Sequence, residues 1–291
     1  MAFYIVTDVA CDLPKSYIDK QQNFYVIPMP YRIDGQDKMY TPYDGGPSLH
    51  EFYDHLRDEC AVSTAQVTLS DYQAVFSRLV NQGHEVLYMC FSSGLSGTYQ
   101  TAMLARSMIL EEKPDAKLYV IDTLCPSGGE GMLVHYALKK RAEGMNVDET
   151  AKWVLNNRLH IAHWFTVDDL DFLYRGGRVS KSAAFLGGML KIKPILHVNC
   201  EGKLIPREKV MGRKRALKTL AEKYVEFANP KEGQTVFIGH GDCEEDARYT
   251  ADTLRKLAPS VTDIRIMPIG AIIGAHSGPG TVAIFFLCDA R

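Results

Sequence analysis

The sequence lacks the features that mark three common classes of protein. No apolar run approaches the roughly 20 residues that a membrane-spanning helix needs. The formal net charge of −2 provides no basic excess of the kind seen in nucleic-acid-binding proteins. No basic segment precedes the apolar residues at the N-terminus, so we predict no secretory signal and expect a cytoplasmic protein. Stable membrane insertion is not expected, whereas a transient membrane contact stays open.

Metal-binding cysteine patterns are also missing. The seven cysteines include no pair separated by two residues, and their number is odd. Zinc and a disulfide framework are therefore not expected, and several of the thiols are predicted to pack as small apolar groups. His160 and His163 are three residues apart in a predicted strand, where they would face opposite sides. We predict no metal, no cofactor and no catalytic residue.

The first positive feature is a strand, a Gly/Ser turn and a helix in direct succession. An apolar stretch over 86–91 leads into Ser92-Ser93-Gly94-Leu95-Ser96-Gly97, and a helical pattern begins at Thr98. Free backbone N–H groups at such a helix start can bind an anion. No Lys or Arg occurs between Glu85 and Ala105, which favours a singly charged carboxylate over a phosphate. An ordinary turn with a serine N-cap explains the same pattern, so both interpretations stay open.

Strand and helix patterns alternate through the first half of the chain. Apolar runs lie at 3–7, 24–29, 86–91 and 117–121, with Pro30 directly after the second run. Their alternation with helical patterns predicts a parallel sheet with helices on its faces. Because ligands bind at the carboxyl ends of parallel strands, we expect the loops after Asp8, Phe91 and Asp122 to meet.

The second half of the chain predicts a different sheet. Residues 199–203 resemble a hairpin turn, which a purely parallel sheet lacks. We therefore predict a mixed sheet, a boundary near Leu159, and two α/β domains spanning residues 1–159 and 160–291. The predicted strands lie at 161–167, 192–199, 235–239, 263–268 and 281–288, and the predicted helices at 180–190, 213–227 and 244–257.

A histidine in a glycine-rich segment is the second candidate for binding. His276 begins the sequence His276-Ser277-Gly278-Pro279-Gly280 and follows a run of small and apolar residues. We expect this histidine to be displayed in a loop, where it can donate a hydrogen bond to a carboxylate. A tight turn with an incidental histidine remains the alternative.

Arginines form the third group of candidates. Arg175 and Arg178 flank a Gly-Gly turn, an arrangement that suits a phosphate or a partner's carboxylate. Arg213 and Arg215 belong to a basic run over 203–218. Such a run is usually a solvated face, but it can also dock an acidic protein surface.

Seven short motifs in a fixed order give the chain a resemblance to the DegV family, which includes the fatty-acid-binding subunit of bacterial fatty acid kinase. The resemblance covers nearly the full length. The motifs are Thr7-Asp8 with Asp12-Leu13-Pro14; Thr64-Ala65-Gln66; residues 92–100; Asp122-Thr123 with residues 127–131; residues 167–178; residues 190–196; and residues 276–280.

This resemblance implies an N-terminal three-layer α/β/α domain with a parallel sheet and a C-terminal two-layer α/β domain with a mixed sheet. A long-chain fatty acid would lie between them. By motif matching, its carboxylate would be bound by Thr64, Ser93, the Gly94 backbone and His276. No buried cation is needed for such a head group, and each buried CH₂ of the tail would contribute roughly 0.8 kcal/mol.

The resemblance also implies a division of labour. The chain would present the acid without being an enzyme itself, and a separate ATP-dependent kinase subunit resembling DAK-domain proteins would form the acyl phosphate. Arg175, Arg178, Arg213 and Arg215 are the candidates for contacting that subunit or the new phosphate.

The chain departs from the family pattern at several positions. Val9 stands where the family usually has serine, and Ala65 and Val67 fall in a string that usually reads Ser-Gln-Pro-Ser. The loss of hydroxyl groups near the expected head group suggests a different acyl preference. Two other functions stay open: a stand-alone acyl hydrolase using Ser93 and His276, and a regulatory module for another small carboxylate.

Overall fold

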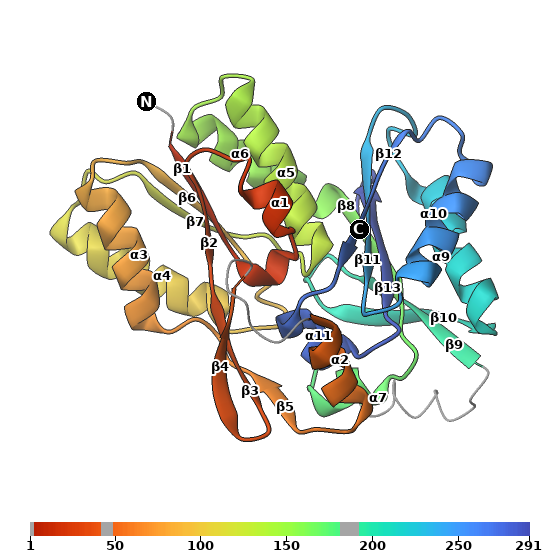
Figure 1. Cartoon of the computed structure of the whole chain (residues 1–291). Coiled ribbons are helices and arrows are strands. Elements are labelled where there is room, and N and C mark those ends of the chain that lie inside the picture. The colour runs from red at the N-terminus through yellow and green to blue at the C-terminus, as the bar shows by residue number, and fades with distance from the viewer. Residues whose placement is uncertain (1–2, 42–48, 181–191) are drawn as a thin grey trace.

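Two large β-sheets stand side by side, each with helices packed against it (Figure 1). The computed structural model describes residues 3–41, 49–180 and 192–291. The helix predicted over 180–190 lies outside these ranges except for its first residue, as does part of the motif at 190–196. Within the described ranges, no helix is long and apolar enough to cross a membrane.

The first sheet is parallel, as predicted. Its strand order is β2-β1-β6-β7, and every pair in it is parallel. All five residues of β6 are buried, as expected for a parallel sheet covered on both faces. Neighbouring strands β1, β6 and β7 end at the same edge, so the loops that follow them meet there. The strands are β1 (Tyr4–Asp8), β2 (Phe24–Ile27), β6 (Val86–Cys90) and β7 (Leu118–Asp122).

Helices cover both faces of this sheet. Figure 1 shows α3 and α4 on one face and α1, α5 and α6 on the other. Asn146 and Glu149 form a reciprocal capping box that fixes the start of α6. The helical elements of this half are η1 (Val9–Cys11), α1 (Lys15–Ile18), α2 (Leu49–Arg57), α3 (Leu69–Asn81), α4 (Thr98–Glu112), α5 (Gly128–Ala142), α6 (Val147–Asn157) and η2 (Arg158–His160).

A small antiparallel sheet, order β4-β3-β5, was not predicted from the sequence. The run over 24–29 was interpreted as one strand ending before Pro30, but Pro30 lies inside β3. The missed signal is Asp34-Gly35, whose positive φ angles suit a tight hairpin turn. The strands are β3 (Met29–Ile33), β4 (Gln36–Tyr40) and β5 (Val62–Thr64).

The second large sheet is mixed, as predicted, with the order β10-β9-β8-β13-β11-β12. Among the described strands of this sheet, β11 and β12 pair in parallel and the other neighbours pair antiparallel. The hairpin predicted over 199–203 is confirmed, because β9 and β10 are antiparallel on either side of it. The elements are β8 (Ile161–Thr166), α7 (Asp171–Arg175), β9 (Ile192–Val198), β10 (Leu204–Met211), α9 (Arg213–Phe227), β11 (Thr235–His240), α10 (Glu244–Leu257), β12 (Asp263–Pro268), α11 (Ala271–Ser277) and β13 (Val282–Leu287).

Helix α5 connects the two large sheets. It packs on the first sheet, and its glycine-rich start lies against β8 and β13 of the second. A Cβ atom at Gly128 would contact the Phe285 ring, and one at Gly129 would overlap the His163 imidazole. The glycines therefore allow this close approach. Helices α9 and α10 cover the other face of the mixed sheet (Figure 1).

A hydrogen bond from α2 to the segment before α11 should contribute measurably to stability. The buried Tyr53 hydroxyl donates to the Ile269 carbonyl over 2.9 Å. We expect Tyr53→Phe to lower the free energy of unfolding by about 1 kcal/mol in urea denaturation, because the carbonyl loses its donor. Tyr174→Phe, at a residue with 40% exposure, should leave the stability unchanged. Equal stability of Tyr53→Phe and wild type would contradict this assignment.

Candidate functional site

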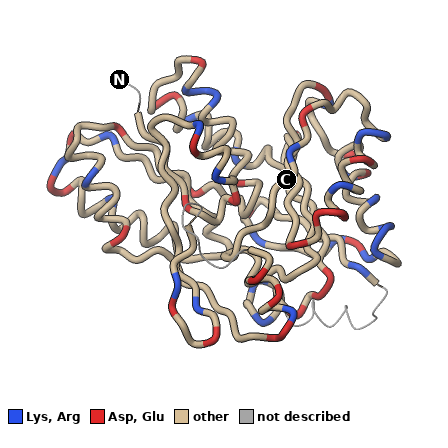
Figure 2. The backbone as a smooth tube through the Cα atoms, in the orientation of Figure 1, with Lys and Arg blue, Asp and Glu red and all other residues tan. Residues whose placement is uncertain are grey.

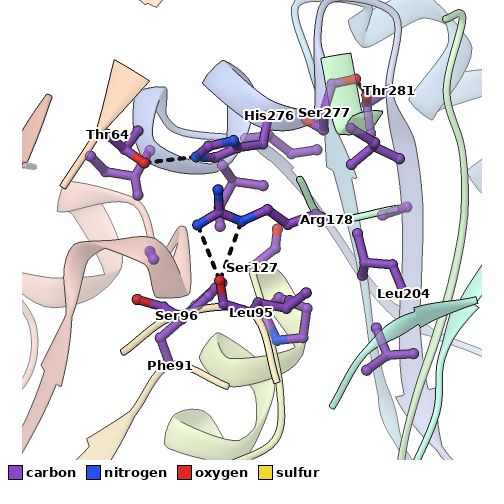
Figure 3. Close-up of a pocket in the computed structure, with 18 of the residues that line it drawn as sticks. Thr64, Phe91, Leu95, Ser96, Ser127, Arg178, Leu204, His276, Ser277 and Thr281 are labelled. Carbon is purple, nitrogen blue, oxygen red and sulfur yellow. Dashed lines mark hydrogen bonds between the residues drawn. The ribbon is translucent and has the colours of Figure 1, made fainter. Parts of the chain in front are cut away.

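The two halves of the chain enclose a mostly apolar cavity of about 300 Å³ (Figure 3). This volume is at the lower end of the range typical for small-molecule sites. Its lining includes a polar group around Thr64 and His276, and its apolar walls come from both halves. The apolar lining residues are Ala10, Met29, Ala65, Phe91, Leu95, Pro126, Phe165, Leu173, Val198, Leu204, Ile269, Ile272, Ile273, Ala283 and Phe285.

The polar end brings together two residues that the sequence predicted. Thr64, the last residue of β5, places its Oγ1 2.7 Å from Nε2 of His276 (Figure 3). The expectation that His276 lies in a loop was wrong, because it lies in the last turn of α11. Gly176 provides the space for its ring, since a Cβ there would overlap Nδ1. The histidine is therefore held in place rather than displayed.

Burial keeps the His276 ring neutral. Desolvation, and secondarily the nearby Arg178 cation, lower the pKa of His276 to about 4. At neutral pH the ring therefore offers one N–H donor and one acceptor nitrogen. Such a ring can donate to a carboxylate without adding a second positive charge.

The part of the cavity near His276 also contains a cation. Arg178 lines the cavity and donates from Nε and Nη2 to the Leu95 carbonyl, over 3.2 and 3.1 Å. A third bond runs from Nη1 to the Gly176 carbonyl over 2.5 Å. Burial lowers the pKa of the guanidinium, but an arginine remains charged. The Gly/Ser turn has no cation of its own and receives one from the other half of the chain.

Ser93 and Gly94, in contrast, do not line the cavity. The Ser93 N–H donates to Asp122, and the Gly94 N–H donates to the Ser92 hydroxyl. Gly94 lies against the backbone of the hairpin turn at Glu201, and the Ser92 hydroxyl donates to the Gly202 carbonyl. This part of the turn therefore contacts the second half of the chain, and Leu95, Ser96 and Gly97 reach the cavity instead.

The other predicted arginines are dispersed. Arg175 is exposed and lies 4.8 Å above the Phe172 ring. Arg213 binds Asp246 and the Gly280 carbonyl, and it lies 3.4 Å from Asp168. Arg215 is exposed on α9, along which several basic residues are spaced (Figure 2), and it contacts Glu222. Only Arg178 of the four lines the cavity.

The departures from the family pattern differ in position. Ala65 lines the cavity, whereas Val9 and Val67 are buried away from it. Further polar groups at the lining include Ser96, Ser277 and Thr281. Ser96 belongs to the Gly/Ser turn that the sequence singled out for an anion, whereas Ser277 and Thr281 were not named as candidates. Among the described residues, the buried Ser277 hydroxyl has no hydrogen-bond partner. Ser277 lies inside the motif over 276–280, and Thr281 directly follows it.

A cluster of buried carboxyl groups lies behind the cavity wall. Asp12 accepts from the Ser127 hydroxyl over 2.5 Å and from the Gly270 N–H over 2.8 Å. It thereby connects the start of α5 with the start of α11. Burial raises the pKa of Asp12 to about 7 and that of Asp8 to about 6. Burial likewise raises the pKa of Glu130 well above its usual value.

Comparison with known proteins agrees with this architecture. The family model described as "Uncharacterised protein, DegV family" matches residues 2–289. The chain belongs to the DegV family. A DegV domain-containing protein of Clostridium perfringens is 42% identical over 295 residues, covering 99% of this chain and 98% of the relative.

Solved structures of DegV proteins share the two-domain fold. One, a fatty acid binding DegV family protein from Streptococcus agalactiae, is 30% identical, with 99% of each chain covered and a TM-score of 0.86. Another, the Fatty Acid Kinase (Fak) B3 protein of Streptococcus pneumoniae loaded with linoleic acid, has 22% identity and a TM-score of 0.85. It covers 99% of this chain and 100% of its own, and at this identity the likeness concerns the fold.

The buried carboxyl groups of this DegV protein predict a pH-dependent stability. Their folded-state pKa values exceed the unfolded ones, so the folded state holds more protons between about pH 4 and pH 7. The free energy of unfolding should therefore fall as the pH rises through that window. Asp12→Asn should flatten this fall in urea denaturation at a series of pH values, because Asn keeps an acceptor for Gly270 but does not titrate.

The exposed Asp58 at the end of α2 provides the matched control. Asp58→Asn should follow the wild-type pH dependence. A slope for Asp12→Asn equal to that of the wild type would show that Asp12 contributes nothing to it.

Proposed function

We propose that this chain binds a long-chain fatty acid in the interdomain cavity and presents the carboxylate to a separate ATP-dependent kinase subunit. The observation that carries the proposal is the polarity of the cavity. One end holds Thr64, His276 and Arg178, and the remaining walls are mostly apolar. A molecule with a single anionic head and a long apolar tail matches this distribution.

The energetics favour such a ligand. Each CH₂ of a tail taken from water contributes roughly 0.8 kcal/mol, so the tail supplies most of the affinity before ordering costs are subtracted. The contacts with the head group then serve mainly to orient the carboxylate. A threonine hydroxyl, a neutral imidazole and a guanidinium can satisfy both carboxylate oxygens, and the guanidinium balances the charge.

The open end of the cavity suits presentation to a second protein. Ala65, Gln66 and Gly97 line the cavity near Thr64 and are exposed. His163, Val198 and Phe285 also line the cavity, and all three are buried. The carboxylate would therefore lie near the surface and the tail in the interior. This arrangement supports transfer of phosphate by an external enzyme.

The kinase role rests on the family resemblance and on this accessibility. A kinase subunit resembling DAK-domain proteins is the proposed partner, and the cytoplasm is the proposed location. Arg175 and Arg215, both exposed, are the proposed contacts for that partner or for the new phosphate. Arg178 is better placed for the carboxylate, and Arg213 for holding the loop at Gly280.

The hydrolase alternative receives no support from the geometry. A serine nucleophile needs a hydrogen bond to a base that is itself oriented by an acid. His276 pairs with Thr64, and in the described part of the chain no hydrogen bond joins it to Ser93 or to a carboxylate.

Head-group binding predicts a graded effect of substitutions. The double variant Thr64→Val/His276→Ala should weaken binding of oleate by about 10-fold to 100-fold in a fluorescence competition assay, because bonds to a charged group are lost. Ser93→Ala should weaken it less, since Ser93 does not line the cavity. The reverse order of effects would instead support the carboxylate site at Ser93 and Gly94 that the family resemblance implies.

The kinase proposal predicts a requirement for two proteins. Purified chain loaded with oleate should yield acyl phosphate only when the kinase subunit of the same organism and ATP are added. Arg175→Ala should lower the rate several-fold while leaving oleate affinity unchanged, because Arg175 lies outside the cavity. Turnover of an acyl ester by the chain alone, or equal kinase activity on free oleate, would contradict the proposal.

A further inference from the structure

A carboxylate, an imidazole and a thiol converge beside the small antiparallel sheet. Asp34 lies in the turn between β3 and β4, His55 in the last turn of α2, and Cys60 in the segment between α2 and β5. Nδ1 of His55 lies 3.7 Å from a carboxylate oxygen of Asp34 and 3.6 Å from Sγ of Cys60. The three groups can place one ligand atom each within 4.8 Å of the other two.

The backbone fixes the positions of these side chains. The Asp34 N–H donates to the Ala61 carbonyl over 3.2 Å, and the Cys60 N–H donates to the His55 carbonyl over 3.0 Å. Asp34 has a φ angle of 49°, in the left-handed region that Asp and Asn tolerate better than most residues. The pairing of β3 with β5 holds the turn beside the segment that carries Cys60. The three side chains therefore meet because of the fold around them.

The spacing of the ligand atoms matches a tetrahedral zinc ion. Zinc bonds to nitrogen, oxygen and sulfur measure roughly 2.0–2.3 Å, which places neighbouring ligand atoms roughly 3.3–3.8 Å apart. Both distances from Nδ1 of His55 fall in this range. An imidazole together with a thiolate favours zinc over Mg²⁺ and Ca²⁺, because those two ions prefer oxygen ligands.

Direct bonding among the three groups explains the cluster less well. A catalytic Cys–His–Asp arrangement uses both ring nitrogens, one for the thiol and the other for the carboxylate. Here both contacts go to the same nitrogen, and 3.7 Å is too long for a hydrogen bond. Local desolvation, and then the Asp34 carboxylate, raise the pKa of the Cys60 thiol, so this thiol is not an activated nucleophile.

A second cluster of similar composition provides a contrast. His50 lies between Asp54 and Asp242, with Nε2 toward the first and Nδ1 toward the second. Arg57 binds the same two carboxylates over 2.7 and 2.6 Å, so they already have a cation. In the part of the chain that the structure describes, no Lys or Arg forms an ion pair with Asp34. The first cluster is therefore the better site for a metal ion.

We propose that Asp34, His55 and Cys60 bind one Zn²⁺ ion, with water in the fourth position. The three residues do not line the acyl cavity, and the proposal does not depend on the proposed function. Binding replaces the proton of the Cys60 thiol, which is released to solvent, and uses the unprotonated Nδ1 of His55. The ion fastens the β3–β4 turn to α2 and to the segment before β5.

The sequence does not indicate this site because its ligands come from three separate elements. The chain has no Cys-x-x-Cys pair, and Asp34 lies far from the other two ligands in the sequence. The fold brings the three groups together.

The test is Zn²⁺ binding by the full chain, stripped of metal, kept reduced and titrated in competition with a chromophoric chelator of micromolar affinity. The wild type should bind one Zn²⁺ at this site. Cys60→Ser should weaken the affinity by about 100-fold, since loss of a residue that only orients a ligand already costs roughly 10- to 100-fold. Asp34→Asn, which keeps a residue suited to the left-handed turn, should weaken it as well. A wild type that cannot compete with the chelator, or an unchanged affinity in Cys60→Ser, would overturn the proposal.

Two matched variants and a second metal assign the site. Cys200→Ser removes an exposed thiol elsewhere, and His50→Ala removes the histidine of the second cluster, so both should retain the wild-type affinity. Loss of binding in either variant would refute the assignment. Co²⁺ in place of zinc should give thiolate-to-metal charge-transfer absorption in the wild type and in Cys200→Ser. Persistence of this absorption in Cys60→Ser would place the ion at another thiol and overturn the proposal.

Discussion

The hydrogen bond between Thr64 and His276 is the contact on which the site depends. It joins residues 212 positions apart and connects the end of β5 with the end of α11 across the mouth of an apolar cavity. Two neighbouring residues have identifiable roles in this contact. Gly176 leaves room for the ring, and Arg178 reaches from beyond α7 to the carbonyl of Leu95. The polar end of the cavity is therefore an interdomain contact, and it exists only when both halves are correctly placed.

The rest of the fold maintains that placement. The glycine-rich start of α5 allows the mixed sheet to approach the parallel sheet. Asp12 ties the start of α5 to the start of α11, and Tyr53 ties α2 to the segment before α11. These bonds are buried, where an unpaired polar group is costly. They position α11, and therefore His276, relative to the Gly/Ser turn.

Regular elements could be predicted from the sequence because their causes are local. The bounds of α4, α9 and α10 agree with the helical patterns, and the parallel and mixed sheets follow from strand alternation and from one hairpin turn. The small sheet was missed because Pro30 suggested a strand end. His276 was assigned to a loop because of its glycine and proline neighbours, and the small and apolar residues before it were not recognised as a helix.

The site itself was only partly predictable, because its contacts are not local. Thr64 and His276 were named from motifs, yet nothing in the sequence states that their side chains touch. Arg178 was predicted to contact a partner or a phosphate, and this stays a prediction; the structure places it in the cavity lining, where it supplies a cation that the Gly/Ser turn lacks. Ser93 and Gly94 were predicted to bind the carboxylate, and this stays a prediction. In the structure the Ser93 N–H donates to Asp122, the Gly94 N–H donates to Ser92, and Gly94 contacts the 199–203 hairpin, so neither residue lines the cavity.

The central claim is that the cavity holds a long-chain fatty acid, and native mass spectrometry of freshly purified protein tests it most directly. The account predicts a mass increment equal to one fatty acid, released on denaturation and restored when oleate is added to delipidated protein. Protein that carries no lipid and takes up none when oleate is supplied would contradict it.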